Sequence, residues 1–443
     1  MEDNIRGSNR VLIIAYHFPP CIGSSGLLRS EKFARYLPEF GWVPIVLTLH
    51  PRAYESVDYR TLAGIPKGLV VLRAFAVDAR RHLSFRGWYA DFLALPDRWA
   101  SWVFGAVPAG LLAIRKHQVK AIFSTFPISS AVLIGFLLHR LTQKPWIVDL
   151  RDSMTEEDYP KNVTLRKVRR WIEAKVVKYA SRIIFTAPST LKMYRERYPR
   201  LSAEKCLLIP NGYDEQDFVS FKEPALAESS GDHLMRFLHT GLIYPDERDP
   251  RPFFAALSRL KREGTISNSV LRVSFRAAGS ESLFQQMIDH AGISDLVELQ
   301  PHVPYQQSLQ ECADADALLV FQAANCNHQI PAKVYEYLRI RKPIFALTSE
   351  SGDTAALLKE IGGATIANLS DEQDIYVALP KFLTAVRKGL HALPDPDKIR
   401  RYARRAQAGE LAICLSNVAE NALSPEESER NATREPASIR RSS

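Results

Sequence analysis

The chain contains 443 residues, of which 46% are hydrophobic and 24% are charged, and its formal net charge is +9. This length exceeds one ordinary hydrophobic core and predicts two domains of roughly 200 residues each. The positive charge favours an anionic partner, such as a phosphorylated substrate or a lipid surface. Because the sequence has no helix-turn-helix, zinc-finger or RNP-like aromatic motif, nucleic acid ranks last and we expect no such partner.

The cysteines and the apolar stretches bear on where the protein acts. The five cysteines are scattered, and no pair has CxxC spacing, which fits a reducing cytoplasm. The first ten residues lack the apolar core of a signal peptide. Trp99–Ile114 is too short for a membrane span, and Ala121–Leu138 is interrupted by polar residues, so we expect a strand, a turn and a helix there. These features predict a cytoplasmic protein.

Short apolar runs alternate along the chain with longer amphipathic stretches. Such runs are typical of parallel strands covered on both faces, with crossover helices between them. The pattern therefore predicts an α/β protein with Rossmann-like sheets. The strands expected in the first half are Val11–Tyr16, Pro44–Leu49, Val70–Phe75, Ala121–Thr125, Trp146–Leu150, Arg182–Ala187 and Leu207–Pro210. Those expected in the second half are Arg236–Thr240, Leu271–Ala277, Val297–Leu299, Ala317–Phe321, Pro343–Leu347 and Ala364–Asn368.

A polar segment at residues 220–233 marks the predicted domain boundary. We expect an N-terminal Rossmann-like domain over residues 10–219 and a C-terminal Rossmann-like domain over residues 234–397. A helix is predicted over residues 398–423. The tail at residues 424–443 is rich in Ser, Glu and Arg, which predicts disorder.

A glycine-bearing loop follows the first predicted strand and leads into a helix. Gly23 and Gly26 lie in this loop, where glycine lets the backbone approach an anion closely and free N–H groups point at phosphate. A plain tight turn explains the same residues equally well. At the end of the fifth strand, Arg151 and Asp152 lie at the edge where open α/β sheets bind ligands. A helix cap with a local salt bridge is the alternative for these two residues.

A second loop of this kind follows the first strand of the C-terminal half. The strand ends at Thr240 and Gly241, and Arg248 lies a few residues beyond. Such a loop with a cation nearby is suited to a diphosphate, although Arg248 is equally explained as a solvated surface charge.

The segment Asn327–Leu338 contains the highest density of candidate ligand-binding residues. A proline followed by good helix formers marks a helix N-terminus. Lys333 and Glu336 are three residues apart, so they share one face of that helix. A cation near a helix N-terminus suits phosphate, and a carboxylate one turn further suits the hydroxyl groups of a ribose.

Taken together and in this order, these segments resemble the family-4 type of GT-B glycosyltransferases, especially those of bacterial surface-polysaccharide synthesis. The resemblance covers about residues 10–420 and implies a GT-B fold, in which two Rossmann-like domains face a cleft. The matching segments are YHFPPCIGSSGLLRSEKFARYLPEFGW, PWIVDLRDSM, IPNGYD, FLHTGLIY and IPAKVYEYLRIRKPIFAL.

The resemblance implies that the C-terminal domain holds a nucleotide-diphosphate sugar and that the acceptor enters from the N-terminal side. Glu336 matches the second glutamate of the family's E-x7-E motif, which holds the ribose, but His328 stands where the first glutamate is expected. The predicted donor-binding residues are Gly23, Gly26, Thr240, Gly241, His328, Ile330, Lys333 and Glu336. The predicted catalytic residues are Lys333, Arg248 and Asp152.

The implied reaction transfers a sugar, with retention of configuration, to a hydroxyl of a glycan or a lipid-linked saccharide. Cations and helix N-termini can stabilise the leaving diphosphate, so we expect no cofactor. Asp314 and Asp316 form the DxD pattern that holds a metal in some glycosyltransferases, but they directly precede a strand and belong to the opposite edge of the sheet. We therefore predict no metal site. The alternatives are a catalytically inactive sugar-nucleotide-binding or scaffold subunit and a GT-B sugar-nucleotide epimerase.

A strongly basic stretch runs from Lys161 to Arg182 and holds eight basic residues and one acid, Glu173. Its apolar residues fall on one helical face, which predicts a helix packed on the sheet with a solvated basic face. The alternative is that this basic face contacts an anionic membrane surface near a lipid-linked acceptor. The protein would then be peripheral on the inner face of the cell membrane.

Overall fold

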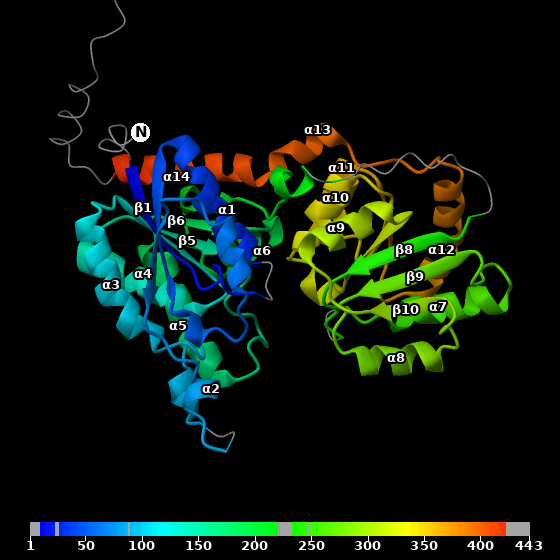
Figure 1. Ribbon diagram of the computed structural model, residues 1–443, viewed down its shortest axis with the longest axis horizontal. Coiled ribbons are helices and arrows are strands. Elements are labelled where there is room, and N and C mark those ends of the chain that lie inside the picture. Colours follow the sequence, from blue (N-terminus) through cyan, green and yellow to red (C-terminus); the bar gives the residue numbers. More distant parts are fainter. Residues whose placement is uncertain are drawn as a thin grey trace, which may run out of the picture. The chain divides into compact units, whose positions relative to one another are not determined.

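The computed structural model describes residues 9–22, 26–86, 89–219, 221, 233–245 and 248–421 (Figure 1). The chain divides into two compact units. The N-terminal unit comprises residues 1–186, 191–209 and 405–443, and the C-terminal unit comprises residues 187–190 and 210–404. Gly23 and the predicted disordered tail lie outside the described residues.

The described part of the N-terminal unit is built on a seven-stranded parallel sheet of order β3-β2-β1-β4-β5-β6-β7. One buried core packs helices α3, α4 and α5 on the sheet, and a second core packs α1 and α14 on it. The strands are β1 (Asn9–Ile14), β2 (Trp42–Leu49), β3 (Val70–Ala74), β4 (Ala121–Thr125), β5 (Trp146–Leu150), β6 (Arg182–Phe185) and β7 (Cys206–Leu208). The helices are α1 (Gly26–Tyr36), α2 (Ala79–His82), α3 (Trp102–Lys116), α4 (Ser129–Thr142), α5 (Val163–Tyr179), α6 (Pro188–Arg197) and α14 (Arg404–Glu420).

The described part of the C-terminal unit is built on a six-stranded parallel sheet of order β10-β9-β8-β11-β12-β13. Its strands are β8 (Met235–Thr240), β9 (Leu271–Arg276), β10 (Val297–Gln300), β11 (Ala317–Gln322), β12 (Ile344–Thr348) and β13 (Ala364–Ala367). Its helices are α7 (Arg251–Arg262), α8 (Glu281–His290), α9 (Tyr305–Asp314), α10 (Ala332–Ile340), α11 (Asp353–Ile361), α12 (Glu372–Arg387) and α13 (Pro396–Ile399).

The thirteen strands predicted from the sequence are all confirmed, with small differences at their ends. The stretch Ala121–Leu138 forms β4 and most of α4, as predicted, and no helix in the described ranges is long and apolar enough to cross a membrane. The prediction of one helix over residues 398–423 is wrong. The backbone is extended at Ala403, which forms a bridge with Tyr213, so the helical path is broken between α13 and α14.

Candidate functional site

The turn that follows β8 is the first part of the candidate site in the C-terminal unit. Gly241 has φ +95°, a left-handed conformation that favours glycine. A Cβ atom at this position would overlap the ammonium group of Lys333. The Nζ of Lys333 also donates a hydrogen bond to Oγ1 of Thr240 over 3.2 Å. Three predicted donor-binding residues, Thr240, Gly241 and Lys333, are thus brought together in this unit.

Two cations and a neutral histidine surround this turn. Burial lowers the pKa of Lys333, and the nearby charge of Arg248 lowers it further, while Glu336 raises it. Burial, followed by the charge of Lys333, lowers the pKa of His239 to about 3, so this imidazole is neutral at physiological pH. The Nε–H of Arg248 is buried and has no hydrogen-bond partner among the described residues. An anion at the turn would compensate both cations.

Glu336 lies one turn beyond Lys333 on α10, as its spacing in the sequence predicts. Its Oε1 accepts a hydrogen bond from the hydroxyl of Tyr305 over 2.8 Å, and within the described ranges Oε2 has no such partner. Burial raises the pKa of Glu336, whereas Lys333 and the Tyr305 hydrogen bond lower it. A carboxylate with one oxygen fixed and the other open is suited to bind a hydroxyl group.

His328 and Ile330 lie in the segment between β11 and α10. The backbone carbonyl of His328 accepts a hydrogen bond from the Thr190 hydroxyl over 2.5 Å, and its ring Nε2 is 3.4 Å from the side-chain nitrogen of Gln329. Ile330 is partly buried against the hydrophobic cluster that includes Val334. These contacts fix the segment that leads into α10, and the role of His328 beside a donor sugar stays a prediction.

In the N-terminal unit, the glycine loop is held against the fifth strand. A Cβ at Gly26, the first residue of α1, would overlap the guanidinium of Arg151. Arg151 also donates to the carbonyl of Phe126 over 2.6 Å and to Nδ1 of His17 over 3.2 Å. Burial and then the Arg151 charge lower the pKa of His17 to about 3, so His17 is the acceptor. A guanidinium beside the N-terminus of a helix attracts an anion.

The carboxylates near the end of β5 have different surroundings. Asp149 is fully buried and forms a bidentate ion pair with Arg29, whose Nη2 lies 2.8 Å from Oδ1, and it accepts the hydroxyl of Thr125 over 2.9 Å. Asp149 therefore holds α1 to the sheet. Asp152 lies two residues beyond the strand and is half-buried. Burial lowers the pKa of Arg151, and the charge of Asp152 offsets part of this effect. A catalytic role for Asp152 stays a prediction.

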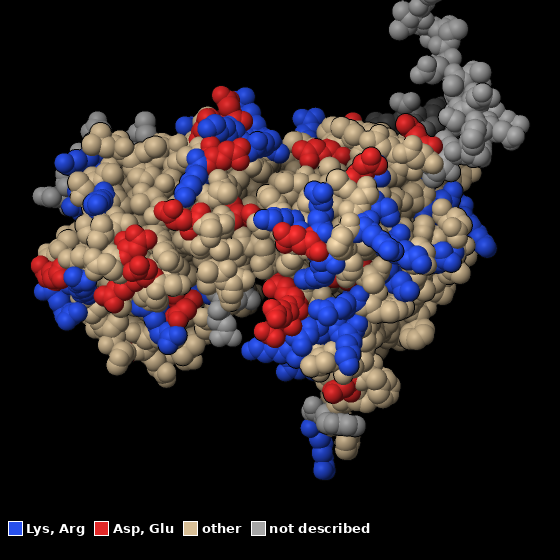
Figure 2. All heavy atoms as spheres, turned by 180° about the vertical axis from the view of Figure 1, so that it is seen from behind, with Lys and Arg blue, Asp and Glu red and all other residues tan. Residues whose placement is uncertain are grey.

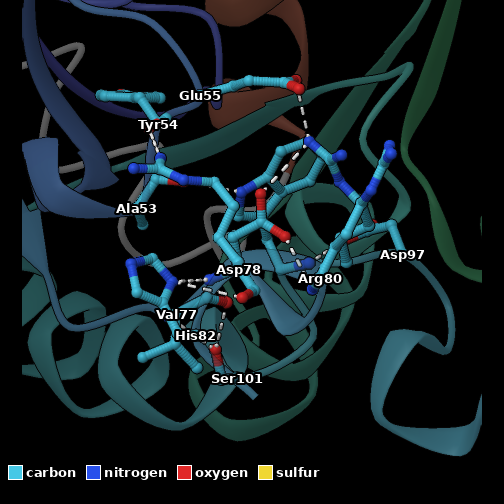
Figure 3. A network of polar contacts seen from close by, with 12 residues as sticks. Ala53, Tyr54, Glu55, Val77, Asp78, Arg80, His82, Asp97 and Ser101 are labelled. Atoms are coloured by element: carbon cyan, nitrogen blue, oxygen red, sulfur yellow. Dashed lines mark hydrogen bonds and ion pairs between the residues drawn. The ribbon is translucent and has the colours of Figure 1, made fainter. Parts of the chain in front are cut away.

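A polar network holds the loops that follow β2 and β3 (Figure 3). Asp78 is fully buried, accepts the backbone N–H of Arg80 over 3.0 Å and pairs with Arg98 over 3.2 Å. Arg98 also pairs with Glu55 over 2.9 Å. The hydroxyl of Ser101, at the start of α3, donates to the carbonyl of Val77 over 3.0 Å. These contacts fix the loops at the carboxyl ends of β2 and β3.

The two aspartates of the DxD pattern are placed as predicted, at the amino end of β11. Asp314 is the last residue of α9, and the backbone N–H of Arg236 donates to Asp316 over 2.8 Å. Within the described ranges, no group of three or more His, Cys, Asp and Glu side chains is arranged to hold a metal ion.

One residue of the site, Tyr305, was not found from the sequence. Tyr305 starts α9 and reaches Glu336 from 31 positions away. No pattern in the sequence indicated Tyr305. Arg151 was predicted at a ligand-binding edge, with a local salt bridge as the alternative, and its hydrogen-bond partners lie after β1 and β4.

A valine in place of Gly26 tests the glycine loop of the N-terminal unit. Since even a Cβ would overlap Arg151, Gly26→Val should displace that guanidinium and lower sugar turnover about tenfold. The fold should survive, because the obstructing group is the end of a flexible side chain. Gly64→Val is the matched control, because its Cβ would meet only ordinary contacts. Normal turnover by Gly26→Val, with an unchanged melting temperature, would show that the loop is only a turn.

Part of the chain is similar in sequence to a known protein family. The model of the Glycosyl transferase 4-like domain matches residues 28–212. No curated protein sequence matches the chain.

Among solved structures, the chain is similar to a glycosyltransferase from Rickettsia africae ESF-5, with a TM-score of 0.62 and 8% identity over 94% of this chain and 100% of the other. It is similar to sucrose-phosphate synthase from Thermosynechococcus elongatus, with a TM-score of 0.58 and 12% identity over 96% and 99% of the two chains. A UDP-N-acetylglucosamine 2-epimerase has a TM-score of 0.54 and 13% identity over 97% of both chains. At identities this low, the structural similarity shows the fold alone. It confirms the predicted α/β, GT-B fold class.

Proposed function

We propose that this chain, whose residues 28–212 match the model of the Glycosyl transferase 4-like domain and whose fold is GT-B, is a retaining glycosyltransferase with a nucleotide-diphosphate sugar as donor. The acceptor is a hydroxyl of a glycan or a lipid-linked saccharide in surface-polysaccharide synthesis. The protein works at the cytoplasmic side of the membrane, as a peripheral protein.

One observation carries the donor assignment. Lys333 lies against the Thr240–Gly241 turn, and Glu336 follows one helical turn later with one carboxylate oxygen open. A diphosphate at the turn would meet the charges of Lys333 and Arg248. A ribose hydroxyl, attached to that diphosphate, would then bind Oε2 of Glu336.

The chemistry proposed for this site is electrostatic. As the bond between the sugar and the diphosphate breaks, negative charge grows on the leaving phosphate. Lys333 and Arg248 stabilise that charge, and the leaving phosphate takes the proton of the acceptor hydroxyl on the same face of the sugar. Within the N-terminal unit, Gly26 and Arg151 form an anion-binding edge of their own, and Asp152 is proposed to orient the acceptor.

An epimerase shares the fold, so the reaction has to be established by its products. Free nucleotide diphosphate should appear only when donor and acceptor are both present. Conversion of the donor into an epimeric nucleotide sugar without acceptor, and without net release of nucleotide diphosphate, would favour the epimerase. Donor binding without any turnover would favour the scaffold subunit.

Replacing Glu336 by glutamine tests the donor assignment. A charged hydrogen bond contributes about 1.5–3 kcal/mol, so donor affinity should fall about ten- to a hundredfold. Because burial raises the pKa of Glu336, the affinity of the native protein should fall on acidification at a higher pH than an exposed glutamate would produce, while the affinity of Glu336→Gln stays flat. Calorimetric titration with a panel of nucleotide-diphosphate sugars measures both effects.

The control for this substitution is Glu372→Gln, which changes an exposed carboxylate of the same unit. It should bind donor normally. If Glu336→Gln lowers the melting temperature and leaves donor affinity unchanged, Glu336 only stabilises its own domain through Tyr305.

A further inference from the structure

Three helices lie side by side on one face of the N-terminal sheet and form a continuous outer surface. Phe136 of α4 packs against Trp171 and Tyr179 of α5, with ring centroids 6.5 and 5.5 Å apart. On its other side, α4 packs against α3, where a Cβ at Gly110 would press on Leu138. The outward sides of α3, α4 and α5 are called the three-helix face below.

The three-helix face exposes large apolar side chains. Along α3, Phe104, Pro108 and Leu112 follow one another at four-residue spacing, and Phe104 is 80% exposed and Leu112 69%. Leu141 at the end of α4 is 61% exposed, and Trp171 in the middle of α5 is 50% exposed. Scattered apolar residues are normal on protein surfaces, but four large ones on three adjacent helices are not scattered.

The same face carries basic residues. On α5, Lys167, Arg170 and Lys178 are exposed at helical spacing around Trp171. The ammonium of Lys175 lies 5.2 Å from the Trp171 ring centroid. Further basic residues end the neighbouring helices, namely Arg115 and Lys116 on α3 and Arg140 on α4. Figure 2 shows Lys and Arg side chains gathered on the N-terminal unit, at the right of that view.

Acidic side chains are missing from this face over the full length of α3, α4 and α5. The three helices contain a single acid, Glu173. Its side chain is fully buried and paired with Arg197 over 2.9 Å. Solvated protein surfaces usually intersperse both signs of charge, so a face with one sign only and with exposed aromatic and aliphatic side chains is adapted to an anionic, partly apolar partner.

We propose that the three-helix face docks on the surface of an anionic lipid bilayer. The apolar side chains enter the boundary between headgroups and acyl chains, where the amphipathic ring of Trp171 is favoured. The basic side chains reach the lipid phosphates, while their aliphatic stems cover apolar surface. This inference deepens the proposed function, because it names the surface that brings the enzyme to a lipid-linked acceptor.

Co-sedimentation of the full-length protein with vesicles tests the proposal without donor or acceptor. The protein should bind vesicles that contain phosphatidylglycerol much better than vesicles of phosphatidylcholine alone, and high salt should weaken the binding. The variant Lys167→Glu/Arg170→Glu/Lys178→Glu should bind the anionic vesicles about a hundredfold more weakly, since each basic residue at the surface adds about fivefold. Phe104→Ser/Leu112→Ser should remove the binding that remains at high salt.

The matched control reverses the same number of charges on the other unit, as Arg272→Glu/Lys381→Glu/Lys388→Glu, all at exposed positions. It should bind anionic vesicles like the native protein. Equal binding to both kinds of vesicle, or equal loss of binding in the control and in the α5 variant, would overturn the proposal. A dimer in solution that Trp171→Glu converts to a monomer, without vesicle binding by either form, would instead assign the face to a second copy.

Separate measurements test the proposed function and this inference, so one can be refuted without the other. Turnover of a donor with a water-soluble acceptor, measured without vesicles, should be the same in all these variants, because none of the substituted residues lies in the candidate site. Vesicle binding without any turnover would refute the enzyme and leave the docking surface in place. Turnover without selective vesicle binding would refute the docking surface alone.

Discussion

Alanine in place of Lys333 should lower the turnover rate about a hundred- to a thousandfold, which is the usual effect of losing one preorganised group that faces developing charge. Donor binding should weaken much less. In the proposed site, several groups would bind the diphosphate in the ground state, whereas the Lys333 ammonium would most directly meet the additional charge that forms as the sugar leaves. Rapid-mixing kinetics for the rate and calorimetry for donor affinity separate the two effects.

The structure explains why Lys333 is suited to this role. Its ammonium is confined between the Thr240 hydroxyl and the backbone of Gly241, so it needs little reorganisation when charge develops. Burial lowers its pKa, and the carboxylate of Glu336 counteracts part of this effect. The control is Lys359→Ala, an exposed lysine of α11 that pairs with Glu350. If rate and affinity fell by the same factor in Lys333→Ala, Lys333 would bind the donor without favouring the transition state.

The strands could be predicted because their sequences are almost continuously apolar. β4 and β5 are buried at every position, including Ser124 and Asp149, so the pattern of each run depends on burial and not on alternation. The start of α10 was also predictable, since a proline fixes the residue before the helix and strong helix formers follow. Local chemistry decides these elements, and local chemistry is visible in one sequence.

The contacts between distant segments could not be predicted in this way. Arg29 and Asp149 are 120 positions apart and form the ion pair that joins α1 to β5. The break after α13 has the same origin, because the pairing of Ala403 with Tyr213 depends on a segment almost two hundred positions earlier. Pairing of this kind follows from the fold and leaves no local pattern.

The contacts of Glu173, on the basic helix α5, also could not be predicted from the sequence. In the stretch from Lys161 to Arg182 it is the single acid beside eight basic residues, which predicted a helix with a solvated basic face. The structure buries this carboxylate beneath the basic face. Its Oε1 accepts the hydroxyl of Tyr198 over 2.7 Å and pairs with Arg197 over 2.9 Å, and its Oε2 accepts the hydroxyl of Tyr194 over 2.8 Å.

The surroundings of Glu173 also anchor the loop that carries Arg151. The hydroxyl of Thr155 donates to Glu173 over 3.2 Å, and the backbone N–H of Met154 donates to the hydroxyl of Tyr194 over 3.1 Å. Burial and the Glu173 charge both raise the pKa of Tyr194 far above its ordinary value, so its hydroxyl stays protonated and donates to the carboxylate. One buried carboxylate thus joins α5, α6 and the segment after β5.

Glu173→Ala should therefore destabilise the N-terminal unit by about 3–5 kcal/mol, the usual effect of removing one partner from a buried ion pair. The substitution leaves the buried hydroxyl of Tyr194 and the half-buried Arg197 and Tyr198 without their acceptor, and it opens a cavity beside α5. Urea denaturation followed by tryptophan fluorescence should show a lower midpoint for the transition of this unit. Glu173→Gln keeps the volume and one acceptor and should be affected less. The control is Glu196→Ala, an exposed residue of α6 whose side chain is 67% accessible and which should unfold like the native protein. A midpoint for Glu173→Ala equal to that of the control would mean that the tyrosines and Arg197 are satisfied without the carboxylate.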